Sequence, residues 1–292
     1  MKKYLLLIQF LLMPVIISYA EIFTLTTAAG INTFSQKEYV FQNDSKVSEL
    51  TWDCPIIPYI ELGVLSRLHN FEFNLSYATV IPIKSGTLKD LDFNSTDISQ
   101  YSSHNLYVDK KYAFTFQAGY NFSSKNLFFF PFATFCYKNQ KFFGRDGYYQ
   151  YPETGIWTGN ETKTNLKGNI ISYESEFFIF GIGLSTAVTS KNFTVKLIGV
   201  LNPYIKGNAI DSHYMRKKQF YDSFDGKFGF SLSSEFYYKK IFLRLSYNHI
   251  PLLKGSTADN VIGVSNSDFL EQKNFQGGTC LDSFSLSLGR KI

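Results

Sequence analysis

The stretch "SSKNLFFFPFATFCY", residues 123–137, joins a short polar turn to a segment rich in phenylalanine. Aromatic residues bounded by small polar residues are typical of a β-strand and its turn. Similar strand-like segments recur at residues 71–83, 112–122, 177–188, 193–201, 228–238, 241–247 and 283–289. No long stretch of the sequence has a helical period, so the chain is predicted to be all-β.

The connections between these segments alternate in length. Short polar breaks lie at residues 66–70, 123–126, 189–192 and 237–240. Long polar stretches lie between them, at residues 42–48, 84–111, 145–168, 207–225 and 254–276. Short turns at one end and long loops at the other are typical of outer-membrane barrels. The pattern predicts a ten-stranded antiparallel transmembrane β-barrel with long extracellular loops, located in the outer membrane.

The predicted strands are longer than a membrane span requires. The 20 residues from Asn70 to Asp90 would extend over roughly 65 Å. At a strand tilt of about 40° they would rise about 50 Å, whereas the apolar band of such barrels is about 25 Å tall. The barrel is therefore expected to project beyond the outer face of the membrane.

The first 20 residues, "MKKYLLLIQFLLMPVIISYA", have the pattern of a secretory signal, with cleavage expected after Ala20. Residues 21–292 would then form the barrel, and the formal net charge would fall from +5 to +3 because two lysines are lost. This charge and the signal argue against a nucleic-acid partner. Three widely spaced cysteines predict neither a disulfide framework nor a metal site.

Two pairs of polar residues lie at the same predicted height. Asp90 with Asp92, and Asp211 with His213, are spaced i and i+2, which places each pair on one face of a strand. Each pair follows a short turn by about 20 residues, on the third and the seventh predicted strands. These strands are nearly opposite in a ring of ten. The pairs are therefore expected to face each other across the mouth of the barrel.

Such an arrangement suits hydrolysis by an activated water molecule. His213 could take a proton from the water while Asp211 orients the imidazole. Asp90 and Asp92 could hold the water from the other side, and one of two neighbouring carboxyls stays protonated more easily. Polar residues at strand ends are, however, expected in any barrel.

Five segments together resemble the omptin family of outer-membrane β-barrel endopeptidases, over nearly the whole of residues 21–292. They are "QKEYVFQNDSKVSELTWD" (36–53), "KDLDF" (89–93), "YSSHN" (101–105), "FATFCYKNQKFFGRDGYYQY" (132–151) and "AIDSHY" (209–214). By this resemblance the catalytic residues are Asp90, Asp92, Asp211 and His213, in an extracellular groove. Ser102 matches a serine that supports catalysis without being the nucleophile.

The resemblance also implies a substrate and an activator. Glu38 matches an acidic residue that binds the substrate's Arg or Lys, but a second acidic position of the family is occupied by Ala209. Tyr137 and Lys141 match residues that bind lipopolysaccharide, while Asn139 replaces the acidic residue between them. We expect peptide or protein substrates with basic residues, no cofactor, lipopolysaccharide or another outer-membrane lipid as the activator, and a monomer.

Two other interpretations remain open at this stage. The chain could be a non-enzymatic barrel, a porin or an adhesin, that binds a surface ligand through its loops. It could also be an omptin-like barrel that has lost activity. The basic run "RKKQFYD", residues 216–222, is interpreted as a solvated loop, or else as a contact with lipid headgroups or acidic parts of the substrate.

Overall fold

The computed structural model describes residues 22–226, 228–262 and 270–292, and their secondary structure is entirely β. The predicted signal, residues 1–20, lies outside the described residues. The strands are β1 (Ile22–Gln42), β2 (Ser45–Leu68), β3 (Phe71–Val80), β4 (Ile83–Asn94), β5 (Asp97–Tyr120), β6 (Phe122–Ser124), β7 (Leu127–Gln150), β8 (Thr164–Ser190), β9 (Phe193–His213), β10 (Lys218–Gly226), β11 (Gly229–Tyr238), β12 (Ile241–Val261) and β13 (Leu270–Lys291).

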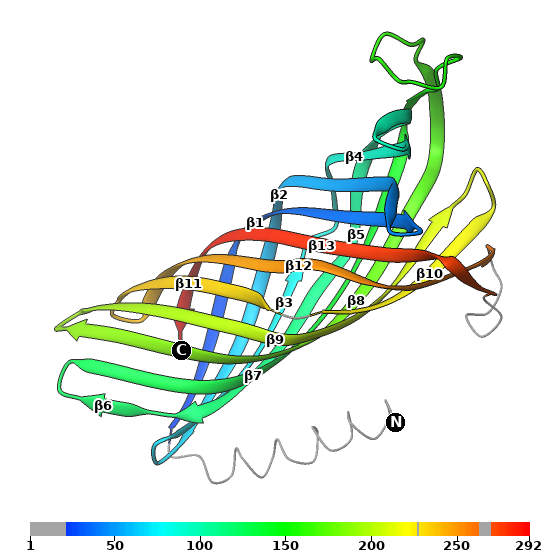
Figure 1. Ribbon diagram of the computed structural model, residues 1–292. Helices are drawn as coiled ribbons and strands as arrows, with labels where there is room; N and C mark the ends of the chain where they lie inside the picture. The colour runs from blue at the N-terminus through cyan, green and yellow to red at the C-terminus, as the bar shows by residue number, and fades with distance from the viewer. Residues whose placement is uncertain (1–21, 227, 263–269) are drawn as a thin grey trace.

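These segments form a barrel of ten strands. The third strand consists of β3 and β4, which both pair with β2 and β5. β5 and β6 together form the fourth strand, and β10 and β11 form the eighth, between β9 and β12. Pro82 separates β3 from β4 because proline has no N–H to donate to a neighbouring strand. The predicted ten-stranded antiparallel barrel is confirmed (Figure 1).

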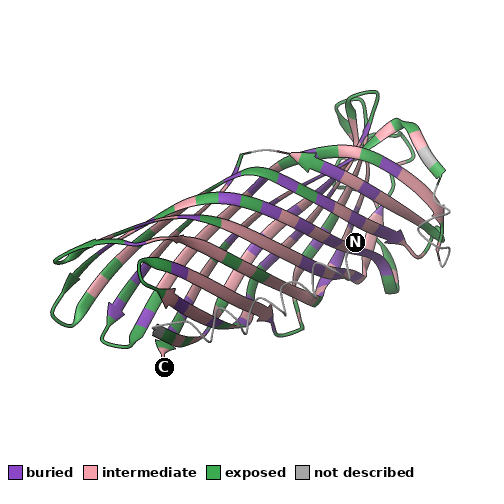
Figure 2. Ribbon diagram, turned by 90° about the horizontal axis from the view of Figure 1, so that it is seen from below, coloured by how far each residue is buried: buried purple, intermediate pink, exposed green. Residues whose placement is uncertain are grey.

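Pairing of the first and last strands closes the barrel. β1 pairs with β13 from Thr26↔Lys291 to Gln42↔Phe275. Successive side chains on a strand point to opposite faces, and buried and exposed positions alternate along the strands accordingly (Figure 2). One set of side chains faces the barrel interior and the other faces outward.

The short turns lie where the sequence predicts them. The left-handed residues His69, Lys125, Lys191 and Lys239 each have φ between 45° and 54° in a two-residue turn, as tight hairpins require. At the other end, most residues of the predicted long loops belong to strands. The irregular connections there comprise residues 43–44, 95–96, 151–163 and 214–217 among the described residues, and residues 263–269 lie outside the described part.

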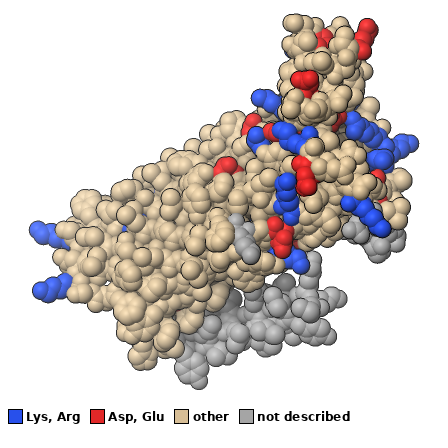
Figure 3. Space-filling model, in the orientation of Figure 1, with Lys and Arg blue, Asp and Glu red and all other residues tan. Residues whose placement is uncertain are grey.

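The outer surface divides into an apolar part and a charged part. Charged side chains gather toward the end that carries the β4–β5 hairpin and the loop 151–163, while the face beside it is mostly uncharged (Figure 3). Exposed apolar residues near the short turns include Leu62, Phe116, Leu184, Leu197 and Leu243. Such a band suits the hydrocarbon core of a membrane. Within the described residues, no helix is long and apolar enough to cross a membrane.

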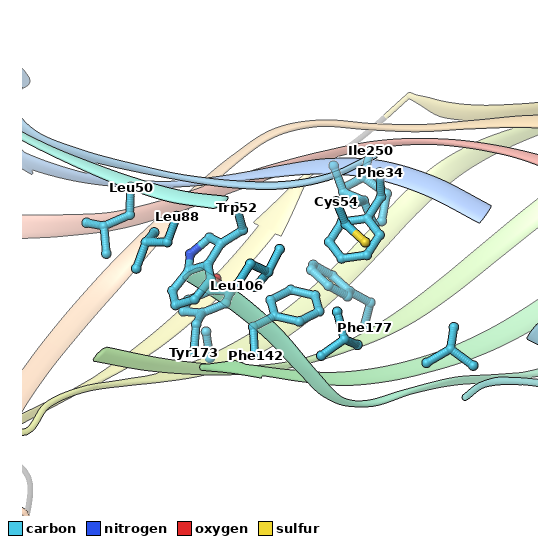
Figure 4. Packing of buried hydrophobic residues seen from close by; sticks show 14 of the residues in the cluster. Phe34, Leu50, Trp52, Cys54, Leu88, Leu106, Phe142, Tyr173, Phe177 and Ile250 are labelled. Carbon is cyan, nitrogen blue, oxygen red and sulfur yellow. The ribbon is translucent and has the colours of Figure 1, made fainter. Parts of the chain in front are cut away.

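Aromatic side chains fill the interior beneath the charged end. The Phe142 ring lies 5.0 Å from the Phe34 ring and 5.8 Å from the Trp52 ring, and Trp52 stacks on Tyr173 at 6.1 Å, all measured between centroids. These residues come from opposite walls and point toward one another (Figure 4). Trp52, Phe142 and Tyr173 are fully buried. They form a packed floor under the mouth of the barrel.

Replacement of Phe142 by alanine should lower the free energy of unfolding by ~3–5 kcal/mol, because it removes a buried ring and leaves a cavity in this floor. Urea titration of the refolded barrel, followed by its mobility on unheated gels, measures the change. Phe143→Ala is the matched control, since Phe143 is only partly buried and points the other way; its expected cost is about 1 kcal/mol. Equal losses for the two variants would contradict the packed floor.

Candidate active site

Asp211 and His213 form a hydrogen-bonded pair at the end of β9. The imidazole Nε2–H of His213 donates to Asp211 Oδ2 at 2.5 Å, and both side chains are largely buried. Burial lowers the pKa of His213, but the Asp211 carboxylate, with Asp90 behind it, outweighs burial and raises the pKa above its ordinary value. The edge of Phe220 packs against the imidazole from β10. Nδ1 of His213 is left to contact another group.

Asp90 and Asp92 lie on β4, across the barrel mouth from this pair. Arg216, in the turn after β9, reaches across so that its Nη2 lies 3.8 Å from Asp92 Oδ2. Burial and the neighbouring Asp92 raise the pKa of Asp90 to about 7, and His213 acts in the opposite direction. The two pairs predicted from the sequence therefore face one another within electrostatic reach.

A serine and a histidine lie directly beside Asp90. Ser102 on β5 is the register partner of Asp90, and its Oγ lies 2.8 Å from His104 Nε2. The Nδ1–H of His104 must donate to the Asp146 carbonyl, at 2.6 Å, because a carbonyl only accepts. Burial lowers the pKa of His104, which favours the neutral ring. The Ser102 hydroxyl therefore donates to His104, which leaves its oxygen as an acceptor on the side of Asp90.

Backbone geometry holds the Asp146 carbonyl in this position. Asp146 and Gly147 have φ of 55° and 98°, where β7 departs from regular pairing with β8. A side chain at Gly147 would collide with the Ser103 carbonyl oxygen, 2.0 Å from the Cβ position. Glycine at 147 therefore permits the bend that orients His104.

Glu38 projects from β1 into the same interior and is 2% exposed. Burial raises the pKa of Glu38 well above its ordinary value, and the Asp211, Asp222 and Asp90 carboxyls raise it further. The Glu38 carboxyl also forms a side-chain hydrogen bond with Asp211, which requires one of the two carboxyls to be protonated. The site is thus strongly acidic.

Tyr137 and Lys141 lie on the outer wall, away from this interior. The Tyr137 hydroxyl donates to Glu176 at 3.1 Å, and Lys141 pairs with Glu174 at 3.3 Å. The amide of Asn139 lies 3.5 Å from the Tyr137 hydroxyl. Position 139 carries an amide instead of an acidic side chain, and Glu174 and Glu176 on the neighbouring strand β8 supply the acidic groups there.

The structure also adds residues that the sequence interpretation missed. Arg216 lies in an exposed turn, as the interpretation of this run as a solvated loop predicts, and reaches Asp92 from there. The interpretation is wrong for residues 218–222, because β10 begins at Lys218 and Asp222 is buried on it. A period-2 signal was available, since Asp222 shares a strand face with Phe220 and Phe224. His104 was not assigned a role, and its position beside Ser102 depends on the bend at Gly147.

A family model described as the Omptin family matches residues 19–289. The chain belongs to the omptin family. This membership and the barrel fold support an outer-membrane protease.

A solved structure has the same fold as this omptin. The outer membrane protease OmpT from Escherichia coli superposes with a TM-score of 0.81 at 16% identity, over 94% of this chain and 97% of that chain. OprG from Pseudomonas aeruginosa (TM-score 0.36, 9% identity, 92% and 95% coverage) and Ail from Yersinia pestis (0.32, 9%, 92% and 99%) are more distant. No curated protein matches the chain.

The acidic interior should make the omptin's stability depend on pH. Glu38 has a raised pKa in the folded state, so folding favours its protonated form, and this contribution is lost as pH rises above about 4, the unfolded value. The free energy of unfolding should therefore fall between pH 5 and pH 8. Glu38→Gln should flatten this dependence, and Glu153→Gln, at an exposed loop position, should leave it unchanged.

Urea titrations of the three proteins at both pH values provide the measurement. An equally steep pH dependence in the Glu38→Gln variant would show that this carboxyl is not responsible.

Proposed function

We propose that the omptin is an endopeptidase that hydrolyses extracellular peptides or proteins beside basic residues, through a water molecule held between Asp211–His213 and Asp90–Asp92. The observation that carries the proposal is the convergence of these two pairs from opposite walls, with a protonatable imidazole on one side and a carboxyl of raised pKa on the other. Perturbed ionisable groups in a cleft are typical of catalytic sites.

In the proposed mechanism His213 is the general base. Asp211 accepts the hydrogen bond from Nε2 and stabilises the imidazolium that forms when the other ring nitrogen takes a proton from water. The water oxygen attacks the carbonyl carbon of the peptide bond. The C–N bond then breaks, and the imidazolium returns the proton to the departing amine. No covalent intermediate forms.

The opposite pair supplies the other half of the site. A carboxylate at Asp92 accepts a hydrogen bond from the water, and the protonated form of Asp90, whose pKa is about 7, donates to the carbonyl oxygen as negative charge develops there. The Ser102 hydroxyl directs its proton to His104, so that its oxygen remains a hydrogen-bond acceptor beside Asp90. Ser102 is thus a supporting residue and not a nucleophile.

Glu38 supports the preference for basic substrates. It is a buried carboxyl beside the proposed catalytic residues. A guanidinium or ammonium group of the substrate would neutralise it. The groove is proposed to face the outside of the cell, since the short turns lie at the other end of the barrel.

An outer-membrane lipid is the proposed activator. Tyr137 and Lys141 face outward together with Lys110. Both lysines form ion pairs with the carboxylate of Glu174. Lipopolysaccharide phosphates could pair with these lysines, and Tyr137 could donate to a lipid oxygen. In the absence of such a lipid, Glu174 pairs with the two lysines and Glu176 accepts a hydrogen bond from Tyr137.

Refolded protein should cleave a quenched peptide that contains Arg-Arg and should leave the matched Ala-Ala peptide intact, in the presence of lipopolysaccharide. His213→Ala should reduce kcat/KM by at least about 10³-fold, because the proposed general base is lost. A porin or adhesin has no reason to cleave either peptide. Equal cleavage by wild type and variant would mean that His213 has no catalytic role.

A further inference from the structure

Asp222 is a buried carboxyl that forms no ion pair with a lysine or arginine among the described residues. It lies on β10, is 4% exposed, and faces Thr257 of β12. Its Oδ1 has no hydrogen-bond partner among the described residues. Burial raises the pKa of Asp222 to about 7, with a smaller contribution from Asp211, while a hydrogen bond from Thr257 acts in the opposite direction. A carboxyl at such a depth without a cationic partner is costly, so the molecule maintains it at the expense of stability.

The direction of the Asp222 side chain is fixed by a glycine. A Cβ atom placed on Gly277 would lie 2.3 Å from Asp222 Cγ, so the carboxyl passes over β12 and lies against β13. Only the absence of a side chain at Gly277 leaves room for it. Two residues further along β13, Thr279 is the register partner of Glu38 on β1. Asp222 therefore points toward Glu38 along the inner wall.

Asp222 also lies directly opposite Ala209. The two are register partners in the β9–β10 pair. Opposite residues on one face of an antiparallel pair have Cβ atoms about 5 Å apart. A carboxyl on position 222 can therefore enter the same space that a carboxyl on position 209 would enter. Ala209 itself carries only a methyl group there.

The buried polar groups around this space define what it can bind. Asp222 Oδ1 has no hydrogen-bond partner among the described residues, the Glu38 carboxyl faces Asp211, and the fully buried hydroxyl of Tyr173 faces Thr279. The Tyr173 hydroxyl adds a polar group that is not a carboxyl. It interacts electrostatically with Glu38, Asp222 and Asp211, most strongly with Glu38.

No lysine or arginine in the described part of the chain forms an ion pair with Glu38 or Asp222. The described residues also contain no group of three His, Cys, Asp or Glu side chains suited to a metal ion. A planar guanidinium has five N–H donors and one positive charge, which matches two carboxyls and a hydroxyl better than a single ammonium does. The expected occupant is an arginine side chain.

We propose that Asp222 and Glu38 together bind the arginine side chain of the substrate, and that Asp222 supplies from β10 the carboxylate that is missing at Ala209 on β9. The inference rests on the proposed peptidase function for the identity of the substrate. It assigns specificity to a residue that takes no part in the chemistry at the peptide bond. Loss of Asp222 should therefore weaken arginine recognition selectively.

Binding is measured separately from cleavage. In the His213→Ala background, a fluorescent peptide with one arginine is compared with the same peptide carrying citrulline, which keeps the shape and loses the charge. Asp222→Asn should weaken binding of the arginine peptide at least tenfold and change citrulline binding less than twofold. Asp225→Asn, an exposed position on the same strand, is the matched control and should change neither.

A swap variant tests the geometry. Ala209→Asp combined with Asp222→Ala should restore most of the arginine preference, since the carboxyl returns to the same space from the opposite strand. Unheated-gel mobility verifies that each barrel is folded, and Asp222→Ser replaces Asp222→Asn if the latter does not fold. An unchanged arginine-to-citrulline ratio in the Asp222 variants would overturn the inference, as would equal loss of both peptides.

Cleavage assays of the same changes with His213 intact distinguish this inference from the proposed function. Arginine binding that depends on Asp222 in a protein that cleaves nothing would support the inference and refute the peptidase. If the Asp222→Asn variant cleaves beside arginine with the same preference as wild type, the peptidase function is supported and the inference about Asp222 is refuted.

Discussion

The hydrogen bonds between β1 and β13 are the constraint on which the site depends. They close ten strands into a ring, so strands that are four apart in sequence order face each other. In a flat sheet, four strand spacings would separate β4 from β9 by about 19 Å. In the closed barrel Arg216 from one side contacts Asp92 on the other at 3.8 Å. Closure thus brings together residues that are distant in the chain.

The aromatic floor and the acidic mouth depend on each other. Trp52, Phe142 and Tyr173 pack across the interior and exclude water from below. This low-polarity floor is part of the reason that burial raises the pKa of Asp90 and Glu38 directly above it. A barrel selected for stability alone would have no use for several buried carboxyls in one place. Their presence is explained if a cationic group of the substrate completes the site.

Much of the fold could be predicted because its signals are local. Period-2 alternation and the spacing of short turns gave the strand number, and the i, i+2 spacing placed Asp211 beside His213. The extent of the strands at the outer end was not predictable in the same way. Polar residues there look like loop in the sequence, but hairpin pairing extends the strands nearly to the tips.

The missed residues depend on contacts between distant parts of the chain. Asp222 follows a basic run, which suggests a solvated segment, and only the space left by Gly277 on β13 reveals where its carboxyl lies. His104 acquires its orientation from the Asp146 carbonyl, 42 residues away in sequence. No local pattern encodes either contact. The resemblance to omptins gave Glu38 and the gap at Ala209, but not the residue that lies opposite this gap.

A double-mutant cycle tests most directly whether the two pairs act as one unit on one water molecule. kcat/KM for an arginine peptide is measured for wild type, Asp90→Asn, Asp211→Asn and the double variant. If both pairs act on the same water, the double variant should lose no more than about tenfold beyond the worse single variant, because either change already disables the unit. Losses that multiply would mean that the pairs act independently, and would contradict the account.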